Sequence, residues 1–305
     1  MNQTTKPPIA PIGKLPLKPI LILLSLSVIW GTNWAAVKIG NREFAPIFMA
    51  GLRSLIATIC LAVWLRVQGK ALFPSRQITW YGVGAGLLFG LEFALIYVGL
   101  KFTYASRVYV VLYTAPFFTA LGAHFFLKDD RLTRFKAYGL ILAFSGILAL
   151  FIQKLGGFTA ASVIGDLMVM GAGAIWGSAT VYQKKYLTGK AGAAQILFFN
   201  VVFSLPILFG MSAIWETPLV APLTWMGISS VLYQSLVVVF ITYLIWTELI
   251  NRYPVSLIHA FSFFTPVMGV FISGVIILRE PVGLNLIVAL VLVSLGLVLV
   301  NRPDQ

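Results

Sequence analysis

Apolar runs of about 20 residues recur from one end of this sequence to the other, and they restrict the possible folds more than any other feature. A helix of about 20 residues is roughly 30 Å long, which matches the hydrocarbon core of a bilayer. Hydrophobic residues make up 59% of the 305 residues and charged residues only 10%, whereas soluble domains carry about 25% charged residues. This chain is therefore predicted to be an all-α integral membrane protein.

Ten membrane-spanning helices are predicted, and most of the short breaks between them contain proline or glycine. They lie near residues 19–40, 45–66, 78–100, 104–127, 134–153, 163–184, 192–215, 223–249, 254–278 and 283–301. Residues 1–18 carry four prolines and three lysines and are predicted to form a disordered cytoplasmic tail. No break is long enough to fold alone, so the function is expected within the membrane.

The net charge of +13 is distributed unevenly between the two sides of the predicted bundle. With the N-terminus inside, the inner segments carry 15 Lys and Arg residues and the outer segments carry 6, while Arg53 lies within the second span. This bias predicts a cell (inner) membrane protein with both termini in the cytoplasm. A nucleic-acid partner would need a clustered basic face, which this distribution lacks. The single cysteine, Cys60, excludes an intrachain disulfide.

The segment "VIWGTNWAAVK" at 28–38 has a near copy, "AIWGSATVYQK", at 174–184. Further pairs recur at offsets of 147 or 150: Arg53 with Asn200, Pro116 with Pro266, Asp130 with Glu280, and Gly146 with Gly296. Chance similarity between apolar helices is the alternative explanation. The nearly constant offset and the residue types, which are unusual in membrane helices, favour a duplicated unit of five spans.

An odd number of spans in each copy has a geometric consequence. The second copy enters the membrane from the opposite side, so the two repeats, 19–153 and 163–301, are predicted to be inverted about an axis in the membrane plane. Many secondary transporters have this architecture, with the substrate site near the midplane between the halves.

The two copies resemble EamA domains of the drug/metabolite transporter superfamily. The resemblance covers about residues 20–301. Its motifs are "IWG…K" at 29–38 and 175–184, "GLR" at 51–53, the prolines at 116 and 266, "LREP" at 278–281, "SGILAL" at 145–150 and "LGLVLV" at 295–300. The first copy has "KDDR" where the second has "LREP". The resemblance implies ten spans in two inverted repeats and the transport of small metabolites, often amino acids or drugs and frequently outward. It does not fix the substrate.

The duplicated segments place aromatic and basic residues on one face of each helix, because they are spaced by four residues. The two rows are Trp30, Trp34 and Lys38, and Trp176, Thr180 and Lys184. They are interpreted as a symmetric pathway wall with a cation near each mouth. The alternative for the lysines is that both side chains extend to the membrane interface.

Glu92 lies in the middle of an apolar span, in "LLFGLEFALIY". A carboxylate at this depth is costly, so it is expected to face the bundle interior or water. It is interpreted as a site for a coupling proton or a cationic substrate. A structural carboxyl group that forms a hydrogen bond between helices is the alternative.

Two spans contain a proline preceded by rings at matching positions. They are Tyr109, Tyr113 and Pro116 in the fourth span and His259, Phe263 and Pro266 in the ninth. A proline within a helix removes a hydrogen bond and produces a kink. Each proline is therefore predicted to be a hinge for opening one side of the bundle, and the alternative is a static kink that aids packing.

No metal or other cofactor is expected, because His124 and His259 are the only histidines and neither shares a helix face with a carboxylate. The chain also lacks a phosphate-binding loop for ATP. Lys101 and Arg107 are predicted to be solvated anchors, and Asp129 and Asp130 to balance charge in a basic loop. The substrate pathway is expected to include the aromatic residues Trp30, Trp176, Tyr97, Tyr109, Tyr182 and Tyr243.

Taken together, these features predict a secondary transporter that works by alternating access without ATP. Its cargo would be a small metabolite such as an amino acid or an amphipathic drug, moved outward, with a coupling proton as a possible partner. A channel or lipid scramblase of the same fold is the alternative. A membrane-embedded enzyme fits less well, because the acidic residues form no catalytic cluster. The substrate itself and the oligomeric state do not follow from the sequence.

Overall fold

The computed structural model describes residues 15–277 and 283–302, except for the side chains at positions 34, 273, 274 and 277. Regular structure in these residues is helical. In chain order the helices are α1 (Leu17–Gly40), α2 (Pro46–Val67), α3 (Arg76–Gly99), α4 (Ala105–Leu112), α5 (Ala115–Phe126), α6 (Arg134–Phe151), a 3-10 turn (Ile152–Lys154), α7 (Ala160–Tyr186), α8 (Ala193–Trp215), α9 (Trp225–Leu232), a π-helix (Tyr233–Thr242), α10 (Tyr243–Arg252), α11 (Val255–Ala260), a 3-10 turn (Phe261–Phe263), α12 (Phe264–Val270), a π-helix (Phe271–Ile277) and α13 (Leu284–Val300).

Eight helical stretches in the described residues are long and apolar enough to cross a membrane. Six correspond to α1, α2, α3, α6, α7 and α8; the other two are Ala105–Phe126, which joins α4 to α5, and Trp225–Arg252, which joins α9 to α10. Two shorter apolar helical stretches follow, Val255–Val270 and Leu284–Val300. The chain is therefore a multi-pass helical membrane protein.

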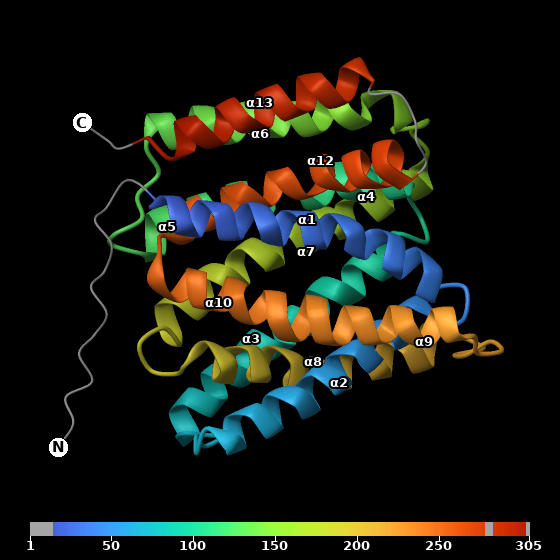
Figure 1. The fold of residues 1–305 in the computed structure, drawn as a ribbon, viewed down its shortest axis with the longest axis vertical. Coiled ribbons are helices and arrows are strands. Elements are labelled where there is room, and N and C mark those ends of the chain that lie inside the picture. Colours follow the sequence, from blue (N-terminus) through green and yellow to red (C-terminus); the bar gives the residue numbers. More distant parts are fainter. Residues whose placement is uncertain (1–14, 278–282, 303–305) are drawn as a thin grey trace.

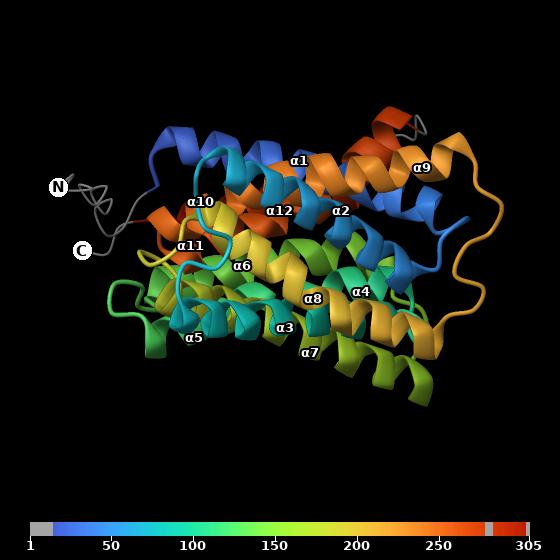
Figure 2. The ribbon, with the colours of Figure 1, turned by 90° about the horizontal axis from the view of Figure 1, so that it is seen from below.

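The long helices lie side by side, with their axes roughly across the view of Figure 1. α6 and α13 form one edge of the bundle, and α2, α3 and α8 form the opposite edge (Figure 1). Seen from below, the same helices form a thick slab rather than a single sheet of rods (Figure 2). The start of α1 and the end of α13 lie at the same end of the bundle in both views.

Several helices begin at a residue whose hydroxyl group accepts a backbone N–H from the first turn. Ser75, Thr133, Thr159 and Thr224 do this for α3, α6, α7 and α9. A hydroxyl at this position satisfies one of the N–H groups that a helix start leaves unpaired. These short polar residues therefore fix where the apolar runs become helices.

Glycine allows α6 and α13 to approach backbone to backbone. A Cβ atom added to Gly139 would lie 2.6 Å from the carbonyl oxygen of Gly296, and one added to Gly146 would lie 3.0 Å from that of Ala289. Helices in lipid associate through such small residues, because no hydrophobic force drives them together. This pair of contacts fixes the edge of the bundle.

Similar contacts hold two inner pairs of helices. A Cβ atom added to Gly31 on α1 would lie 2.7 Å from the amide nitrogen of Gly269 on α12. A Cβ atom added to Gly177 on α7 would lie 2.8 Å from the amide nitrogen of Thr119 on α5. Both glycines belong to the duplicated "IWG" segments. The glycine of each copy thus allows its helix to approach the backbone of a helix from the other copy.

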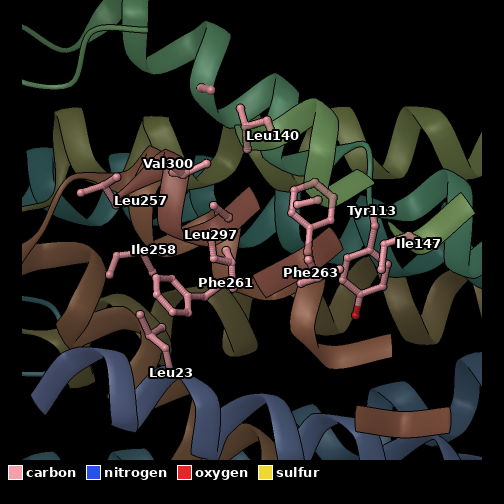
Figure 3. Close-up of a cluster of buried hydrophobic side chains, with 14 of the residues drawn as sticks. Leu23, Tyr113, Leu140, Ile147, Leu257, Ile258, Phe261, Phe263, Leu297 and Val300 are labelled. Atoms are coloured by element: carbon pink, nitrogen blue, oxygen red, sulfur yellow. The ribbon is translucent and has the colours of Figure 1, made fainter. Parts of the chain in front are cut away.

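A large cluster of buried apolar side chains lies between α6, α13 and the stretch from α11 to α12 (Figure 3). Leu140 and Ile147 come from α6, and Leu297 and Val300 from α13. Leu257, Ile258, Phe261 and Phe263 fill the space between these helices and Leu23 of α1. The ninth predicted span is therefore enclosed by protein over most of its described length.

Part of the predicted N-terminal tail differs from expectation. Residues 1–14 lie outside the described residues, but Leu15 is buried and its N–H donates to Oδ1 of Asn301 at 2.8 Å. Helix α1 begins at Leu17 rather than at residue 19. Leu15 and Leu17 are apolar, so the apolar run extends further toward the N-terminus than predicted.

Candidate functional site

A cavity of about 140 Å³ lies in the centre of the bundle. Helices from both halves of the chain contribute to it. Its lining residues are Trp30, Asn33 and Val37 of α1, Arg53 of α2, Phe89, Glu92, Phe93, Ile96 and Tyr97 of α3, Leu112 and Tyr113 at the end of α4, Trp176, Ala179, Thr180 and Gln183 of α7, Leu197 and Asn200 of α8, Val238, Tyr243, Trp246, Thr247 and Ile250 of the stretch up to α10, and Thr265 of α12.

Two ionisable side chains, Arg53 and Glu92, face this cavity. Arg53 is 2% exposed and Glu92 is 6% exposed. The guanidinium carbon of Arg53 lies 4.3 Å from the centroid of the Phe93 ring, which is a cation–π contact. In the described part of the chain, no ion pair joins Arg53 to Glu92. The cavity thus holds a buried basic side chain and a buried carboxyl group that form no direct ion pair.

Several polar atoms around the cavity are buried without a hydrogen-bond partner. They are Nε of Arg53, Oδ1 of Asn33 and Oδ1 of Asn200. Buried polar atoms are nearly always paired in native structures, so unpaired atoms that face a cavity indicate a position for water or a ligand.

The apolar part of the wall is aromatic. The Trp30 ring meets Tyr243 edge to face at 5.7 Å and Trp246 at 5.0 Å, and its Nε1 donates to Oγ1 of Thr242 at 2.7 Å. On the other side, Tyr113 and Trp176 meet edge to face at 6.3 Å. These contacts hold the rings in fixed positions around the cavity.

The cavity lining follows the internal repeat of the sequence. At offsets of 146, 147 or 150, the following pairs both line it: Trp30 with Trp176, Asn33 with Ala179, Val37 with Gln183, Arg53 with Asn200, Phe93 with Tyr243, Ile96 with Trp246, and Tyr97 with Thr247. Both charges come from the first copy, because Arg53 and Glu92 correspond to the neutral residues Asn200 and Thr242. The site is therefore symmetric in position and asymmetric in charge.

Lys184 lies outside the cavity, at the end of α10. Its Nζ donates to the carbonyl oxygens of Ile250 at 2.6 Å, Asn251 at 2.9 Å and Tyr253 at 3.1 Å. The last carbonyls of a helix are unpaired within it and carry partial negative charge. Lys184 therefore caps α10 and fastens it to α7, which differs from both the predicted pathway role and the predicted extension to the membrane interface.

Asp130 fastens the other side of the same turn. Its carboxylate accepts Nζ of Lys136 at 2.7 Å, the N–H of Ser256 at 2.8 Å and the hydroxyl of Ser256. Ser256 is in the first turn of α11, where a carboxylate interacts favourably with the exposed N–H groups. The prediction of simple charge balance is wrong for Asp130, which is buried and joins two halves of the chain, whereas Asp129 is exposed.

At the opposite end of the bundle, Arg107 and Asp166 form an ion pair. Nε of Arg107 donates to Oδ2 of Asp166 at 3.0 Å, and the hydroxyl of Thr103 donates to Oδ1 at 2.7 Å. The prediction that Arg107 is a solvated anchor is wrong, because its partner follows about 60 residues later on α7. This network fastens the turn between α3 and α4.

Two more carboxylates hold the loops at this end. Glu43 accepts the N–H of Thr224 at 2.7 Å and also the Thr224 hydroxyl. These hydrogen bonds lower the pKa of Glu43 below its ordinary value. Glu216 accepts the N–H groups of Ile47 at 2.7 Å and Phe48 at 2.8 Å, at the start of α2. The loop before α2 is thus joined to the loop after α8.

Half of the sequence-predicted pathway residues meet at the cavity. Those that line it are Trp30, Glu92, Tyr97, Tyr113, Trp176, Thr180 and Tyr243. Lys38 is exposed, and Tyr182 lies beside Tyr186 at the surface end of α7. Tyr109 stacks on Phe151 at 5.3 Å. The side chain of Trp34 is not among those that the structure describes.

His259 and Phe263 are fully buried behind the cavity wall rather than in it. Nε2 of His259 lies 2.9 Å from the hydroxyl oxygen of Thr180, and its ring packs against Trp176 at 4.8 Å. The Phe263 ring packs against Phe117 at 6.3 Å. His259 therefore contacts three lining residues, Thr180, Trp176 and Trp246, without lining the cavity itself.

The prolines also lie differently from expectation. The fourth predicted span is interrupted at Tyr113 and Thr114, and Pro116 is in the first turn of α5. Pro266 is in the first turn of α12, directly after a 3-10 turn. A proline in the first turn of a helix loses no internal hydrogen bond. The break thus precedes each proline instead of arising from a missing bond within one helix.

The sequence did not single out Arg53, Asn33, Asn200 or Gln183 as pathway residues, although all four line the cavity. Arg53 was detectable, since an arginine inside an apolar span is rare and faces protein or water. Within the described residues, no group of three or more His, Cys, Asp or Glu side chains is placed to hold a metal ion.

The model of the EamA-like transporter family matches the chain twice, over residues 17–152 and 163–302. A Salmonella typhimurium protein named "Probable amino-acid metabolite efflux pump" is 29% identical, over 90% of this chain and 92% of that protein. "Uncharacterized transporter YoaV" of Bacillus subtilis is 26% identical, over 92% of this chain and 96% of that protein. "Uncharacterized inner membrane transporter YedA" of Escherichia coli is 25% identical, over 90% of each chain.

A solved crystal structure has a similar fold. It superposes with a TM-score of 0.77 over 92% of this chain and 94% of its own, at 20% sequence identity. The helical arrangement is therefore shared by chains whose sequences differ at most positions.

Proposed function

Because the chain belongs to the EamA-like transporter family, we propose that it is a secondary carrier that exports small metabolites by alternating access. The cargo class is that of amino acids and amphipathic drugs. The central cavity carries this proposal, since it combines a buried Arg53 and Glu92 with an aromatic wall. The family and the relatives indicate a transporter rather than an enzyme.

Two inverted repeats of five spans, ten spans in all, are part of the proposal. The contacts of Gly31 with Gly269 and of Gly177 with Thr119 support it, because each residue of one contact corresponds to a residue of the other at the repeat offsets. The same holds for Gly139 with Gly296 and Gly146 with Ala289. With both termini in the cytoplasm of the cell, the turn between α10 and α11 lies on the inner side.

Alternating access requires that the two ends of the bundle open in turn. The fastened turns are candidates for the two gates. Lys184 and Asp130 hold the inner turn, and Asp166 holds the outer turn through Arg107 and Thr103. Each network joins segments far apart in the chain, so a relative movement of these segments would break it.

Glu92 is the residue through which the cavity would take a positive charge, from a coupling proton or from the substrate. Among the described residues its carboxyl group forms no hydrogen bond or ion pair, whereas a structural carboxyl group at this depth would need partners. Glu92→Gln preserves the shape of the side chain and removes its charge. We expect this variant to reach the membrane and to lose pH-gradient-driven accumulation or recognition of the cationic group.

A growth screen followed by counterflow tests the proposal. Cells that overproduce the protein are challenged with toxic amino-acid analogues and cationic drugs, and resistance identifies an exported class. The protein is then purified into liposomes preloaded with unlabelled cargo. A carrier shows uptake of labelled cargo stimulated by the preloaded cargo, whereas a channel or scramblase shows no such stimulation. Absence of stimulation for every cargo found in the screen would contradict the proposal.

A further inference from the structure

We propose that the cavity binds its substrate as a zwitterion, with the substrate carboxylate on Arg53 and the substrate ammonium group on Glu92. The preferred substrates are then free α-amino acids with an apolar or aromatic side chain. This inference rests on the proposed function, and it adds the substrate class and the two residues that select it.

The cavity separates a basic side chain from an acidic one. Arg53 and Glu92 both line it and both are almost fully buried. Removing each charge from water is costly unless an opposite charge compensates it. Among the described residues neither side chain has an ion-pair partner. A ligand that carries both charges compensates the two side chains at once.

Two polar groups that line the cavity have no hydrogen-bond partner. Nε of Arg53 and Oδ1 of Asn200 are buried without a partner. The N–H groups of a guanidinium form a planar fork that matches a carboxylate in two parallel hydrogen bonds. An amide oxygen such as Oδ1 of Asn200 accepts a hydrogen bond and suits an ammonium group. The free groups therefore match both ends of an amino acid.

The balance of charge excludes the simpler ligands. An organic cation would be attracted to Glu92 and repelled by Arg53 in the same cavity. An organic anion would meet the opposite problem. A zwitterion has no net charge and places each of its groups beside the complementary side chain, so it gains both interactions and loses neither.

The aromatic wall suits the rest of the ligand. Trp30, Tyr243 and Trp246 form one packed group, and Tyr113 and Trp176 form another. Fixed aromatic surfaces bind apolar and aromatic side chains, and their faces also attract an ammonium group. The cavity therefore offers an apolar surface beside the charged pair.

Binding is expected in one orientation, because only the first repeat carries the charges. The residues that correspond to Arg53 and Glu92 are Asn200 and Thr242. Thr242 is also engaged, since its hydroxyl accepts Nε1 of Trp30 and donates to the carbonyl of Val238. The second repeat thus provides no alternative pair of charges for a reversed ligand.

The test compares ligands that differ by one charged group. The full-length protein in liposomes is assayed for inhibition of counterflow, and in lipid nanodiscs for binding by calorimetry. The probes are L-phenylalanine, its methyl ester, phenethylamine and 3-phenylpropionate, with L-leucine and its methyl ester as a smaller pair. We expect the free amino acids to bind about 10- to 100-fold more tightly than the compounds that lack one charge.

Two variants assign the charges to the residues. Arg53→Gln should weaken binding of the free amino acids about 10- to 100-fold. It should not weaken binding of their esters, which lack the carboxylate and are repelled by Arg53. Glu92→Gln should weaken binding of the amino acids. It should not weaken binding of 3-phenylpropionate, which lacks the ammonium group and is repelled by a Glu92 carboxylate. Arg66→Gln on α2 and Glu248→Gln on α10 are the controls, since both residues lie outside the cavity. Arg66 is exposed, and Glu248 is partly exposed and paired with Arg252.

Equal binding of an amino acid and its ester to the unmodified protein would overturn the inference, as would tight binding of the cations alone. Neither result depends on whether a variant folds. Stimulated counterflow of a cationic drug without any amino-acid binding would leave the carrier function intact and overturn only the zwitterion site. Absence of stimulated counterflow for all cargoes would instead contradict the proposed function.

Discussion

The Nζ atom of Lys184 lies 2.6 Å from the carbonyl oxygen of Ile250, at the point where α10 ends. Two further carbonyls of the same turn, those of Asn251 and Tyr253, accept from the same ammonium group. One side chain of α7 thus satisfies three acceptors of the turn between α10 and α11. This turn is where we expect the inner side of the bundle to open.

Lys184→Met should loosen this turn. Hydrogen bonds from a charged group contribute about 1.5–3 kcal/mol each in a buried site, and partial exposure of Lys184 places the total effect near the lower value. Amide hydrogen exchange of residues 252–257 should therefore become about tenfold faster. Lys185→Met is the control, because Lys185 is exposed on the same helix. Equal exchange in the two variants would show that the cap does not hold the turn.

Asp130→Asn should destabilise the protein by leaving Lys136 buried without an anion. Loss of one partner of a buried ion pair costs about 3–5 kcal/mol, so the unfolding temperature in detergent should fall by several degrees. Asp129→Asn should leave it unchanged, because Asp129 is exposed. Adding Lys136→Met to Asp130→Asn should restore part of the loss. If the double variant is no better than the single one, the ion pair is not the cause.

Pro116→Ala and Pro266→Ala should slow transport without preventing insertion. Alanine provides a backbone N–H and favours joining α5 or α12 to the helical turn before it, which would stiffen the interruptions at Thr114 and Phe261–Phe263. The measurement is the initial rate of counterflow at equal membrane abundance. Pro46→Ala, in the first turn of the uninterrupted α2, is the control. Normal rates in both variants would leave the prolines as packing residues.

Gly31→Ala should destabilise the contact between α1 and α12. The new Cβ atom would lie 2.7 Å from the backbone nitrogen of Gly269, which cannot rotate away. Overpacking of this kind costs about 1–3 kcal/mol. Gly210→Ala is the control, since no atom lies within 4 Å of its added Cβ. Thermal unfolding in detergent compares the two, and equal stability would mean that the helices shift apart without cost.

The interaction of Glu43 with Thr224 should make the loops before α2 and before α9 sensitive to acid. The pKa of Glu43 is lower in the folded protein than its ordinary value of 4.5, because the carboxylate accepts hydrogen bonds from Thr224. A lowered pKa means that this stabilisation is complete above pH 4.5 and is lost as the pH falls through the folded-state value. The unfolding temperature should therefore decrease less between pH 6 and pH 3 for Glu43→Gln than for the unmodified protein. An identical pH dependence would contradict this assignment.

Sequence reasoning predicted the membrane class and most helix positions, because long apolar runs and their proline and glycine breaks are local signals. It also identified Trp30, Trp176 and Glu92, since these residue types are unusual within apolar runs. It did not find the partners of Lys184, Asp130 and Arg107. The partners Ile250, Ser256 and Asp166 lie about 60 or more residues away and become neighbours only when the helices pack.

The site was predicted only in part for a related reason. The spacing of Lys38 and Lys184 predicts that they share a helix face with Trp30 and Trp176. Spacing along a face does not give the depth at which the cavity ends, and neither lysine lines it. The sequence position of Arg53 places it within the second span but does not identify it as a site residue. Its place in the cavity depends on the rotation of α2 about its own axis, which the nearly uniform apolar pattern of that helix does not specify.

The close contact of α6 with α13 has a consequence for how the chain assembles during synthesis. Gly139 and Gly146 are synthesised before their contact residues, Gly296 and Ala289, which follow about 150 residues later in the chain. At about 5–20 residues per second, α6 spends on the order of ten seconds or more in the membrane before its final neighbour arrives. Exposure of this face to lipid during that interval costs little free energy, because lipid tails are as apolar as the leucine side chains of a neighbouring helix. Helix α13 therefore completes the packing of a helix made long before it.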